Sequence, residues 1–383
     1  MTIQTNRMVP INGRMTQTAI QNRYGHYWNN IYKIVMGLHE VRARVGTFNT
    51  PWNAPSSEFT IMPALTVIND NLHDLMDARA LEISEIAKST KKRIIVQWSG
   101  GIDSTAVLVA FIKNLSTQDL SNVTVALTTN SILENLSFYE RFILDKMHYV
   151  SYANIVVSEE FLSKNILIHG DPGDSIFGPS ISMYADLIAD GRHLAPFKDN
   201  IHTIASQLER SPSVKRFNAD GFGDWYANKI SDNLLEVAPE GVDTIADWWW
   251  WHYFNFKWEF SIARPLFRQK PDKEPISPNA YKFMADNTFF ASDKFQQWSY
   301  SNLKNHIGKD ASTHKREIKQ YIFQFDKNEQ YLLHKRKVES VTLPLDIRIK
   351  NINGYYDENW VLHRVNEGTV GREILERLES YKG

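Results

Sequence analysis

The chain has no cysteine among its 383 residues. This absence excludes a disulfide framework, zinc or iron–sulfur centres held by thiolates, and any mechanism that needs a cysteine nucleophile. It favours a reducing compartment, and residues 1–15 lack the apolar core of a signal peptide. We therefore expect a cytoplasmic protein.

The sequence also has no long apolar run and almost no net charge. No stretch of 18 apolar residues is present, so we expect no membrane partner. The formal net charge of −1 argues against a general polyanion binder, although a local basic patch for nucleic acid stays open. The composition, with 43% hydrophobic and 23% charged residues, is typical of a globular protein, and the length is sufficient for two domains.

Apolar periodicity predicts strands that alternate with helices. Spacings of three and four over 65–90 indicate an amphipathic helix, and the apolar runs that follow are short enough to be buried strands. The predicted strands are 94–98, 123–128, 154–158 and 165–169, and the predicted helices between them are 103–114 and 134–147. Such alternation predicts a doubly wound parallel α/β sheet, which binds ligands beyond the C-terminal ends of its strands.

Beyond the predicted sheet, the pattern is mainly helical and rich in aromatic residues. We expect 180–345 to add a helical layer, with the tryptophan run 248–251 either in its core or serving as a substrate platform. The expected organisation is an N-terminal extension at 1–90, partly helical, one domain at 91–345 and a C-terminal tail at 346–383.

The segment SGGIDS at 99–104 follows the first predicted strand and begins a helix. Gly100 and Gly101 permit positive φ and a close approach to a ligand, and the helix N-terminus offers N–H groups to an anion. The nearby hydroxyl donors are Ser99, Ser104 and Thr105. Asp103 suits a phosphate site if a divalent cation joins its carboxylate to the phosphate. The alternative is an ordinary strand-to-helix turn with a capping side chain.

The segment IHGDPGDSIFG at 168–178 also follows a predicted strand and also combines glycines with acids. In isolation it indicates a solvated Asp-Pro-Gly turn. Two acidic glycine turns at the strand ends of one sheet favour a shared site instead, in which Asp103 and Asp174 hold one Mg²⁺ bound to polyphosphate.

These segments resemble a known superfamily. SGGIDS resembles the pyrophosphate loop of the PP-loop (N-type) ATP pyrophosphatases, and the Walker A pattern is absent. The second segment resembles the SGEGxDExFGG segment of the asparagine synthetase synthetase domain. The matching positions are Gly170, Gly173, Asp174, Phe177 and Gly178. Looser similarities at 288–299, 314–319 and 336–344 follow in the same order. The resemblance implies an adenine nucleotide alpha hydrolase-like fold.

The resemblance also implies a set of site residues. ATP would be bound by Ser99, Gly100, Gly101, Asp103, Ser104, Thr105, Thr128 and Gly170. Asp103 and Asp174 would hold Mg²⁺, and Asp171 would stand at the position of a family glutamate as a catalytic residue. Lys315 would neutralise charge at the α-phosphate, although its polar surroundings in the sequence also fit a solvated helix lysine. Lys335 or Lys337 could take that role instead.

By this resemblance the protein is an ATP- and Mg²⁺-dependent ligase that adenylates a carboxylate, releases pyrophosphate and forms an amide. The glutamine-hydrolysing domain of asparagine synthetases needs an N-terminal cysteine, so this chain cannot hydrolyse glutamine by that chemistry. The expected partners are a small-molecule or peptide carboxylate and an amine or ammonia, which a separate glutaminase could supply.

Two other functions stay open at this stage. A basic patch formed by Lys315, Lys319, Lys335, Arg336 and Lys337 would suit adenylation of a nucleobase or another carbonyl on nucleic acid. The family pattern is broken at Asp171, Ser175 and Pro179, where the family has glutamate, glutamate and glycine. These departures fit a degenerate member that binds a nucleotide without turnover.

Overall fold

The protein is described by a computed structural model. The described residues are 44, 62–178, 185–210, 214, 220–227, 232–267, 278–305, 313–335, 355–356 and 362–363. The predicted N-terminal extension and C-terminal tail therefore lie largely outside them, as do Pro179, Arg336 and Lys337.

The chain divides into two compact units, each assembled from segments that are distant in the sequence. The sheet unit comprises Leu72–Val156, Ser163–Gly170 and Ala311–Gly383, and the helical unit comprises Met1–Asn71, Val157–Leu162 and Asp171–Asp310. The glycine turn at 99–104 belongs to the sheet unit, whereas most of the second acidic segment belongs to the helical unit.

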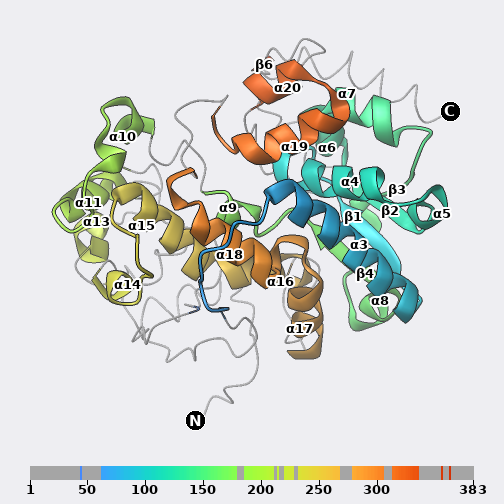
Figure 1. The fold of residues 1–383 in the computed structure, drawn as a ribbon, viewed down its shortest axis with the longest axis horizontal. Coiled ribbons are helices and arrows are strands. Elements are labelled where there is room, and N and C mark those ends of the chain that lie inside the picture. The colour runs from blue at the N-terminus through green and yellow to red at the C-terminus, as the bar shows by residue number, and fades with distance from the viewer. Residues whose placement is uncertain are drawn as a thin grey trace. The chain divides into compact units, whose positions relative to one another are not determined.

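A four-stranded, all-parallel sheet forms the centre of the sheet unit (Figure 1). Its strands are β1 (Arg93–Gln97), β2 (Val123–Leu127), β3 (His148–Ser151) and β4 (Asn165–His169). Runs of branched aliphatic residues make β1, β2 and β4 suitable for burial on both faces, as parallel strands require. The predicted α/β class with a parallel sheet is confirmed.

The strands lie in the order β3-β2-β1-β4, so the direction in which strands are added reverses at β1. The chain first moves from β1 to β2 and β3, and then returns to place β4 on the other side of β1. Gln97 pairs with His169 in the register of β1 and β4, so the C-terminal ends of these two strands lie side by side. In open α/β sheets this point of reversal is where ligands bind.

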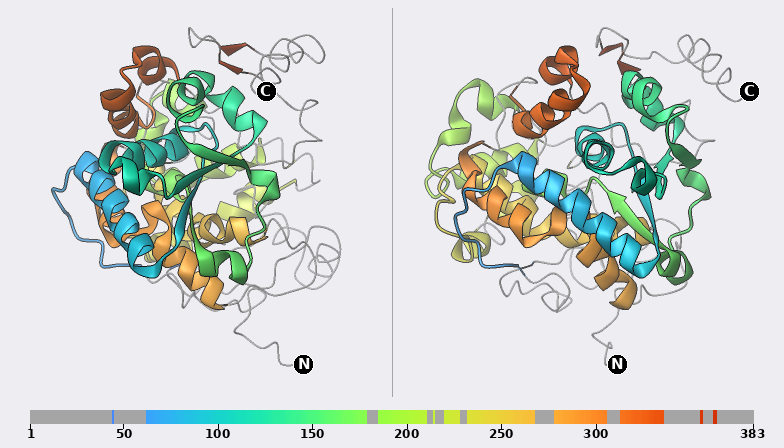
Figure 2. Two further views of the ribbon diagram at one scale, coloured as in Figure 1. Left: turned by 90° about the vertical axis from the view of Figure 1, so that its right-hand side faces the viewer. Right: turned by 45° about the vertical axis from the view of Figure 1, so that its right-hand side comes forward.

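Helices connect and cover the strands. The elements of the sheet unit's first segment are α3 (Leu72–Thr90), α4 (Ile102–Asn114), α5 (Thr117–Leu120), α6 (Thr129–Glu134), α7 (Leu136–Phe138), η2 (Tyr139–Ile143) and η3 (Tyr152–Asn154). The helix α8 (Glu159–Lys164) precedes β4, α19 (Arg316–Asp326) and α20 (Glu329–His334) follow much later, and the short strands β5 (Tyr355–Tyr356) and β6 (Leu362–His363) pair antiparallel. Figure 2 shows α3 lying along the sheet, and α4 packs against both α3 and α19.

The predicted strand at 154–158 is wrong. The strand between β2 and β4 in the sequence is β3, which is formed by His148–Ser151. Residues 155–158 form no regular element. β3 pairs only with β2 and is largely exposed, so its residues carry no apolar run that would reveal it. Ile155 and Val157 are buried and produced the apolar signal, but the chain there makes no strand pairing.

The helical unit contains the aromatic residues that dominate the second half of the chain. Its elements are α9 (Gly173–Ile176), α10 (Ala185–Ala189), η5 (Arg192–Leu194), α11 (Ile201–Glu209), α13 (Phe222–Tyr226), α14 (Asp232–Glu236), α15 (Ile245–His252), η7 (Tyr253–Lys257), α16 (Trp258–Phe267), α17 (Pro278–Asn287), η8 (Phe289–Ala291), α18 (Asp293–Ser301) and η9 (Leu303–Asn305). The tryptophans of 248–251 are each at most 1% exposed, and Trp250 donates its indole N–H to Ser299 Oγ at 2.9 Å. This run is therefore part of a core.

Among the described residues, no helix combines the length and the apolar character needed to cross a membrane.

Candidate functional site

A tight turn links the end of β1 to the N-terminus of α4. Gly100 has a φ of +75°, in the left-handed region that favours glycine. A Cβ at Gly100 would overlap the carbonyl oxygen of Ser131 and would lie 2.6 Å from the Cβ of Glu134. The turn is therefore packed directly against α6, and glycine is required at this position for both conformation and space.

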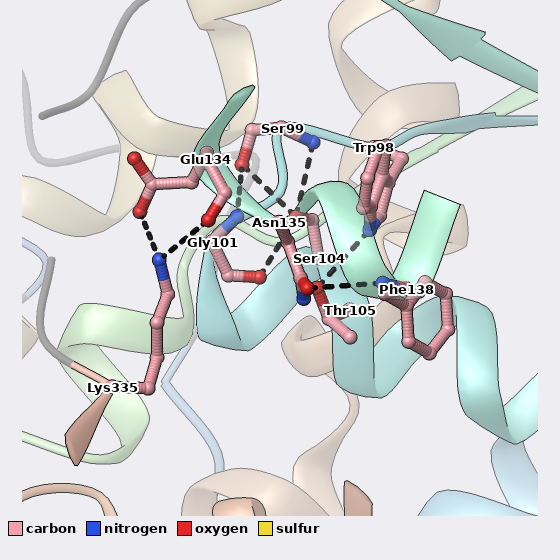
Figure 3. A network of polar contacts seen from close by, with 9 residues as sticks. All are labelled: Trp98, Ser99, Gly101, Ser104, Thr105, Glu134, Asn135, Phe138 and Lys335. Atoms are coloured by element: carbon pink, nitrogen blue, oxygen red, sulfur yellow. Dashed lines mark hydrogen bonds and ion pairs between the residues drawn. The ribbon is translucent and has the colours of Figure 1, made fainter. Parts of the chain in front are cut away.

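Hydroxyl groups hold this turn in one conformation (Figure 3). The Oγ atoms of Ser99 and Ser104 lie 2.9 Å apart, and Ser104 Oγ also accepts the backbone N–H of Ser99 at 3.1 Å. The backbone N–H of Gly101 donates to Ser99 Oγ at 3.3 Å, and Trp98 Nε1 donates to Thr105 Oγ1 at 3.1 Å. The sequence grouped the three hydroxyls as ligand donors, and here they also fix the turn.

The N-terminus of α4 has the features of an anion site. Its N-cap residue is Gly101, which has no side chain to cap the helix. The first N–H groups of a helix have no partner within the helix and carry partial positive charge. An anion at this end would accept hydrogen bonds from these N–H groups and would be attracted by the partial positive charge.

Gly170 follows β4 and lies against the same helix end. A Cβ at Gly170 would lie 2.7 Å from the backbone nitrogen of Ser104 and 3.1 Å from the Cβ of Asp103. The glycine thus allows the end of β4 to approach the first turn of α4 closely. The side-by-side ends of β1 and β4 bring two separate glycine-bearing segments to one place in the sheet unit.

Lys315 is buried and bonded to the acid of the glycine turn. Its Nζ lies 2.8 Å from Asp103 Oδ1 and 2.6 Å from Oδ2, although the two residues are 212 positions apart. The Lys315 side chain is 4% exposed and that of Asp103 is 19% exposed. Lys315 also has a φ of +51° at the N-cap of α19, and non-glycine residues held there often mark functional sites. Lys315 is therefore not a solvated lysine.

A second buried lysine is bonded to Glu134, the residue against which Gly100 packs. Lys335 is fully buried and bonds both the Glu134 carboxylate and, at 3.1 Å, the Glu134 carbonyl oxygen (Figure 3). Burial lowers the pKa of Lys335, and the charge and hydrogen bond of Glu134 oppose that shift. Because Glu134 is the residue against which Gly100 packs, this pair supports the turn.

Thr128 has a local structural role in addition to its predicted one. It is the N-cap of α6, and its hydroxyl and that of Ser131 form a reciprocal capping box. Its side chain is largely buried, at the C-terminal end of β2.

The acids of the second segment belong to the helical unit. Lys257 Nζ donates to Asp174 Oδ2 at 2.8 Å, and both side chains are at most 15% exposed. Ser175, where the family has glutamate, donates to the carbonyl oxygen of Tyr253 at 3.2 Å and so joins α9 to η7. Asp171 is partly exposed and precedes Pro172 with a cis peptide bond.

The sheet unit thus brings together the predicted nucleotide-binding residues with Lys315, and it adds Glu134, which the sequence analysis did not identify. Asp171 and Asp174 belong to the other unit, so a metal shared by Asp103 and Asp174 stays a prediction. Lys257 was also missed. A lysine inside an aromatic run carries no signal of its own, and only its contact with Asp174 indicates a role.

The metal that the resemblance implies can be tested against the residues present. Among the described residues, no group of three or more His, Asp or Glu side chains lies close enough to hold a metal ion. The carboxylate of Asp103 lies in the first turn of α4, and the hydroxyls of Ser99 and Ser104 belong to the turn that leads into that helix. Mg²⁺ commonly binds through one or two carboxylates together with substrate phosphates, so the site fits a metal that is bound to a nucleotide.

Comparison of the chain with protein-family models, with curated proteins and with solved structures finds no match.

Proposed function

We propose that the protein is an ATP- and Mg²⁺-dependent ligase that adenylates a carboxylate and passes the acyl group to ammonia or another amine. One observation carries the proposal. A glycine turn at the reversal point of a parallel sheet opens onto an uncapped helix N-terminus beside the buried Lys315. The strand arrangement is compatible with an adenine nucleotide alpha hydrolase-like fold, as the resemblance of SGGIDS implies.

The turn would bind the β- and γ-phosphates of ATP. Its backbone N–H groups and the hydroxyls of Ser99 and Ser104 are suitable donors, and Gly100 and Gly170 leave room for close approach. Mg²⁺ carried by the nucleotide would neutralise phosphate charge, with Asp103 as its ligand from the sheet unit. Lys315 would stabilise the charge that develops as the α–β phosphate bond breaks.

The proposed reaction has two steps. The substrate carboxylate attacks the α-phosphorus, the α–β bond breaks, and pyrophosphate leaves. The amine then attacks the acyl carbon, AMP leaves with the electrons of the broken acyl–oxygen bond, and the amine loses a proton. Asp171 is proposed as a catalytic residue on the family resemblance alone.

The alternative of a nucleic-acid substrate depends on a basic patch, which would have to be exposed to contact phosphates. Lys315 is 8% exposed, and Lys319 and Lys335 are fully buried. Arg336 and Lys337 lie outside the described residues. Because the three described members are buried, they do not form a basic surface, and the structure gives this alternative no support.

The test is ATP–pyrophosphate exchange over a panel of carboxylates, because exchange needs only the adenylation step. We expect one carboxylate class to promote exchange and the Asp103→Asn variant to abolish it. Asp119→Asn is the matched control, since Asp119 pairs with Lys88 at 3.1 Å on the surface of the same unit. Exchange undiminished in Asp103→Asn would refute the assignment of the turn. ATP binding without exchange for any carboxylate would identify a nucleotide-binding protein without turnover.

A further inference from the structure

We infer that Asp77 and Tyr321 are positioning residues, because the hydrogen bond between them fixes α19 against α3 and so holds Lys315 in place. Neither residue belongs to the glycine turn. The expected effect on the reaction rate rests on the proposed function, whereas the expected effect on the position of Lys315 does not.

Helix α19 begins directly after Lys315. Lys315 is the N-cap of this helix, and its carbonyl oxygen accepts the backbone N–H of Lys319 at 3.0 Å. The Nζ atom of Lys315 lies 2.8 and 2.6 Å from the two carboxylate oxygens of Asp103. Hydrogen bonds hold over a narrow range of distances, so a shift of α19 by about 1 Å would weaken this contact.

Tyr321 anchors α19 beyond its first turn. Tyr321 is 1% exposed, and its hydroxyl donates to Asp77 Oδ1 on α3 at 2.5 Å, although the two residues are 244 positions apart. The ring of His73, which is also on α3, meets the Tyr321 ring edge-on, with the centroids 5.2 Å apart. His73 Nε2 lies 3.4 Å from the carbonyl oxygen of Glu317. Two residues of α3 thus contact different turns of α19, which defines the position of α19 along α3.

Asp77 extends this contact to the C-terminal end of α4. It accepts Lys113 Nζ at 2.6 Å and Asn114 Nδ2 at 2.8 Å. Burial raises the pKa of Asp77, but the hydrogen bonds from these two side chains and from Tyr321 outweigh burial and leave the pKa below its ordinary value. At neutral pH Tyr321 therefore donates to an ionised carboxylate, and such a bond is stronger than one between neutral groups.

The two ends of α4 therefore hold α19 at two points. Lys315 bonds Asp103 in the first turn of α4, and Tyr321 is joined through Asp77 to the last turn. Two fixed points set both the direction and the axial position of a helix, whereas one point leaves the helix able to pivot. Lys315 and Asp103 also interact with other residues, so loss of the Tyr321 bond should loosen the contact between them without abolishing it.

The first experiment measures the position of Lys315 directly. The full-length protein is labelled briefly with acetic anhydride, and mass spectrometry gives the rate of acetylation at each lysine. Tyr321→Phe removes the hydroxyl and keeps the ring. In this variant acetylation of Lys315 should rise by about tenfold, the factor expected for loss of a hydrogen bond to a charged group. Lys335 is the internal reference, because it is buried and bonded to Glu134 on α6, and its rate should stay unchanged.

Matched variants separate this bond from other changes. Tyr300→Phe removes a hydroxyl that donates to a backbone carbonyl oxygen in the helical unit, and it should leave the acetylation of Lys315 unchanged. Lys113→Met removes the lysine from Asp77 and keeps the bond from Tyr321, so it should have the same outcome. Asp77→Ala removes the acceptor, and it should reproduce the rise at Lys315 if Tyr321→Phe fails to fold.

The second experiment measures ATP–pyrophosphate exchange with the carboxylate that promotes it. Tyr321→Phe should lower kcat by about tenfold, within the range that small displacements cause, and leave KM for ATP unchanged because the glycine turn is intact. In the Lys315→Met background it should cause no further loss, since a positioning residue acts only through the group that it positions. A residue that merely stabilises the fold would lower the rate in both backgrounds.

Unchanged acetylation of Lys315 in a folded Tyr321→Phe protein would overturn the inference. So would an equal rise at Lys315 and Lys335, which would indicate a general loosening of the sheet unit, or a further loss of exchange in the Lys315→Met background. Absence of exchange from the wild type with every carboxylate would instead refute the proposed function, and acetylation of Lys315 would still decide the inference.

Discussion

Two lysine–carboxylate pairs adjoin the glycine turn, and they differ in how far their carboxylates are exposed. Lys335 and Glu134 are at most 8% exposed, and Lys335 also bonds a backbone carbonyl oxygen. Lys315 is equally enclosed, but its partner Asp103 is 19% exposed and lies in the first turn of α4. The closed pair is placed to support the turn. The partly open pair leaves a carboxylate partly exposed in the first turn of α4.

This comparison also separates the lysines that the sequence could not distinguish. Lys315, Lys335 and Lys337 were all candidates for the residue that acts on the α-phosphate. Lys335 bonds Glu134, the residue against which Gly100 packs, and Lys337 lies outside the described residues. Lys315 bonds the acid at the helix end that an anion would approach, so it is the lysine that we assign to the proposed reaction.

The largest effect on stability is expected from breaking the closed pair. Lys335→Met leaves Glu134 buried without its lysine, which should cost about 3–5 kcal/mol in the free energy of unfolding. Chemical denaturation of the purified variant measures this loss. The double variant Glu134→Leu/Lys335→Met should regain most of it, because it removes both charges. A single variant that loses less than about 1 kcal/mol would show that the pair does not support the turn.

The next largest effect is expected from Lys315→Met, and it should appear mainly in the rate. Removing one preorganised group that stabilises transition-state charge typically costs about 10²–10³-fold. We therefore expect ATP–pyrophosphate exchange to fall by about that factor, with a smaller loss of stability than Lys335→Met causes. A larger rate loss in a folded Lys335→Met protein than in Lys315→Met would reverse the assignment of the two lysines.

The buried carboxylate of Asp326 extends the comparison to an acid that bonds no lysine among the described residues. Asp326 is 3% exposed and accepts the backbone N–H of Asn328 at 2.8 Å. Burial raises the pKa of Asp326 from 3.8 to about 6, while the Asn328 N–H and the charges of Arg141 and Lys327 act in the opposite direction.

The sign of the resulting pH dependence follows from that shift. Because the pKa is higher in the folded state, the stabilising effect of protonated Asp326 is complete below about pH 4 and is lost as the pH rises through about 6. Asp326→Asn should therefore stabilise the protein by about 1–3 kcal/mol at pH 8 and change little at pH 4. Denaturation at the two pH values measures this, and equal effects at both would contradict it.

The smallest effect is expected at the surface pair of α4. The Lys113 and Asp77 side chains are 37% and 26% exposed, and Asp77 also accepts from Asn114 and Tyr321. Lys113→Met should change the free energy of unfolding by about 0–1 kcal/mol and leave exchange unchanged. A loss of exchange comparable to that of Lys315→Met would mean that any charge on α4 affects the rate. The difference between the two pairs at the turn would then not explain the effect of Lys315→Met.

The sequence predicted the interior of the sheet well. Continuous aliphatic runs revealed β1, β2 and β4, because a strand buried on both faces must be apolar along its length. The edge strand β3 has exposed residues and one neighbouring strand, so its four residues carry no such run. The single helix predicted over 134–147 is wrong in its extent: Glu134 ends α6, α7 and η2 cover 136–143, and 144–147 are not helical.

The polar part of the site was harder to predict than its backbone. The glycine turn was recognisable because local geometry requires glycine at a fixed spacing from the strand and the helix. Lys315 stands among polar residues that resemble a solvated helix face, and its burial depends on Asp103, which is 212 positions away. Glu134 and Lys257 are similar, since each has a role only through a contact made by folding.

The distance along the chain between the turn and its lysines has a consequence for biosynthesis. Asp103 and Glu134 leave the ribosome more than 200 positions before Lys315 and Lys335. At roughly 5–20 residues per second, the interval is about 10–40 s. During that time the two carboxylates lack the lysines that hold them in the finished fold. The nascent chain therefore cannot form the complete turn until α19 and α20 have been made, and under the proposed function a partly synthesised chain would not sequester ATP.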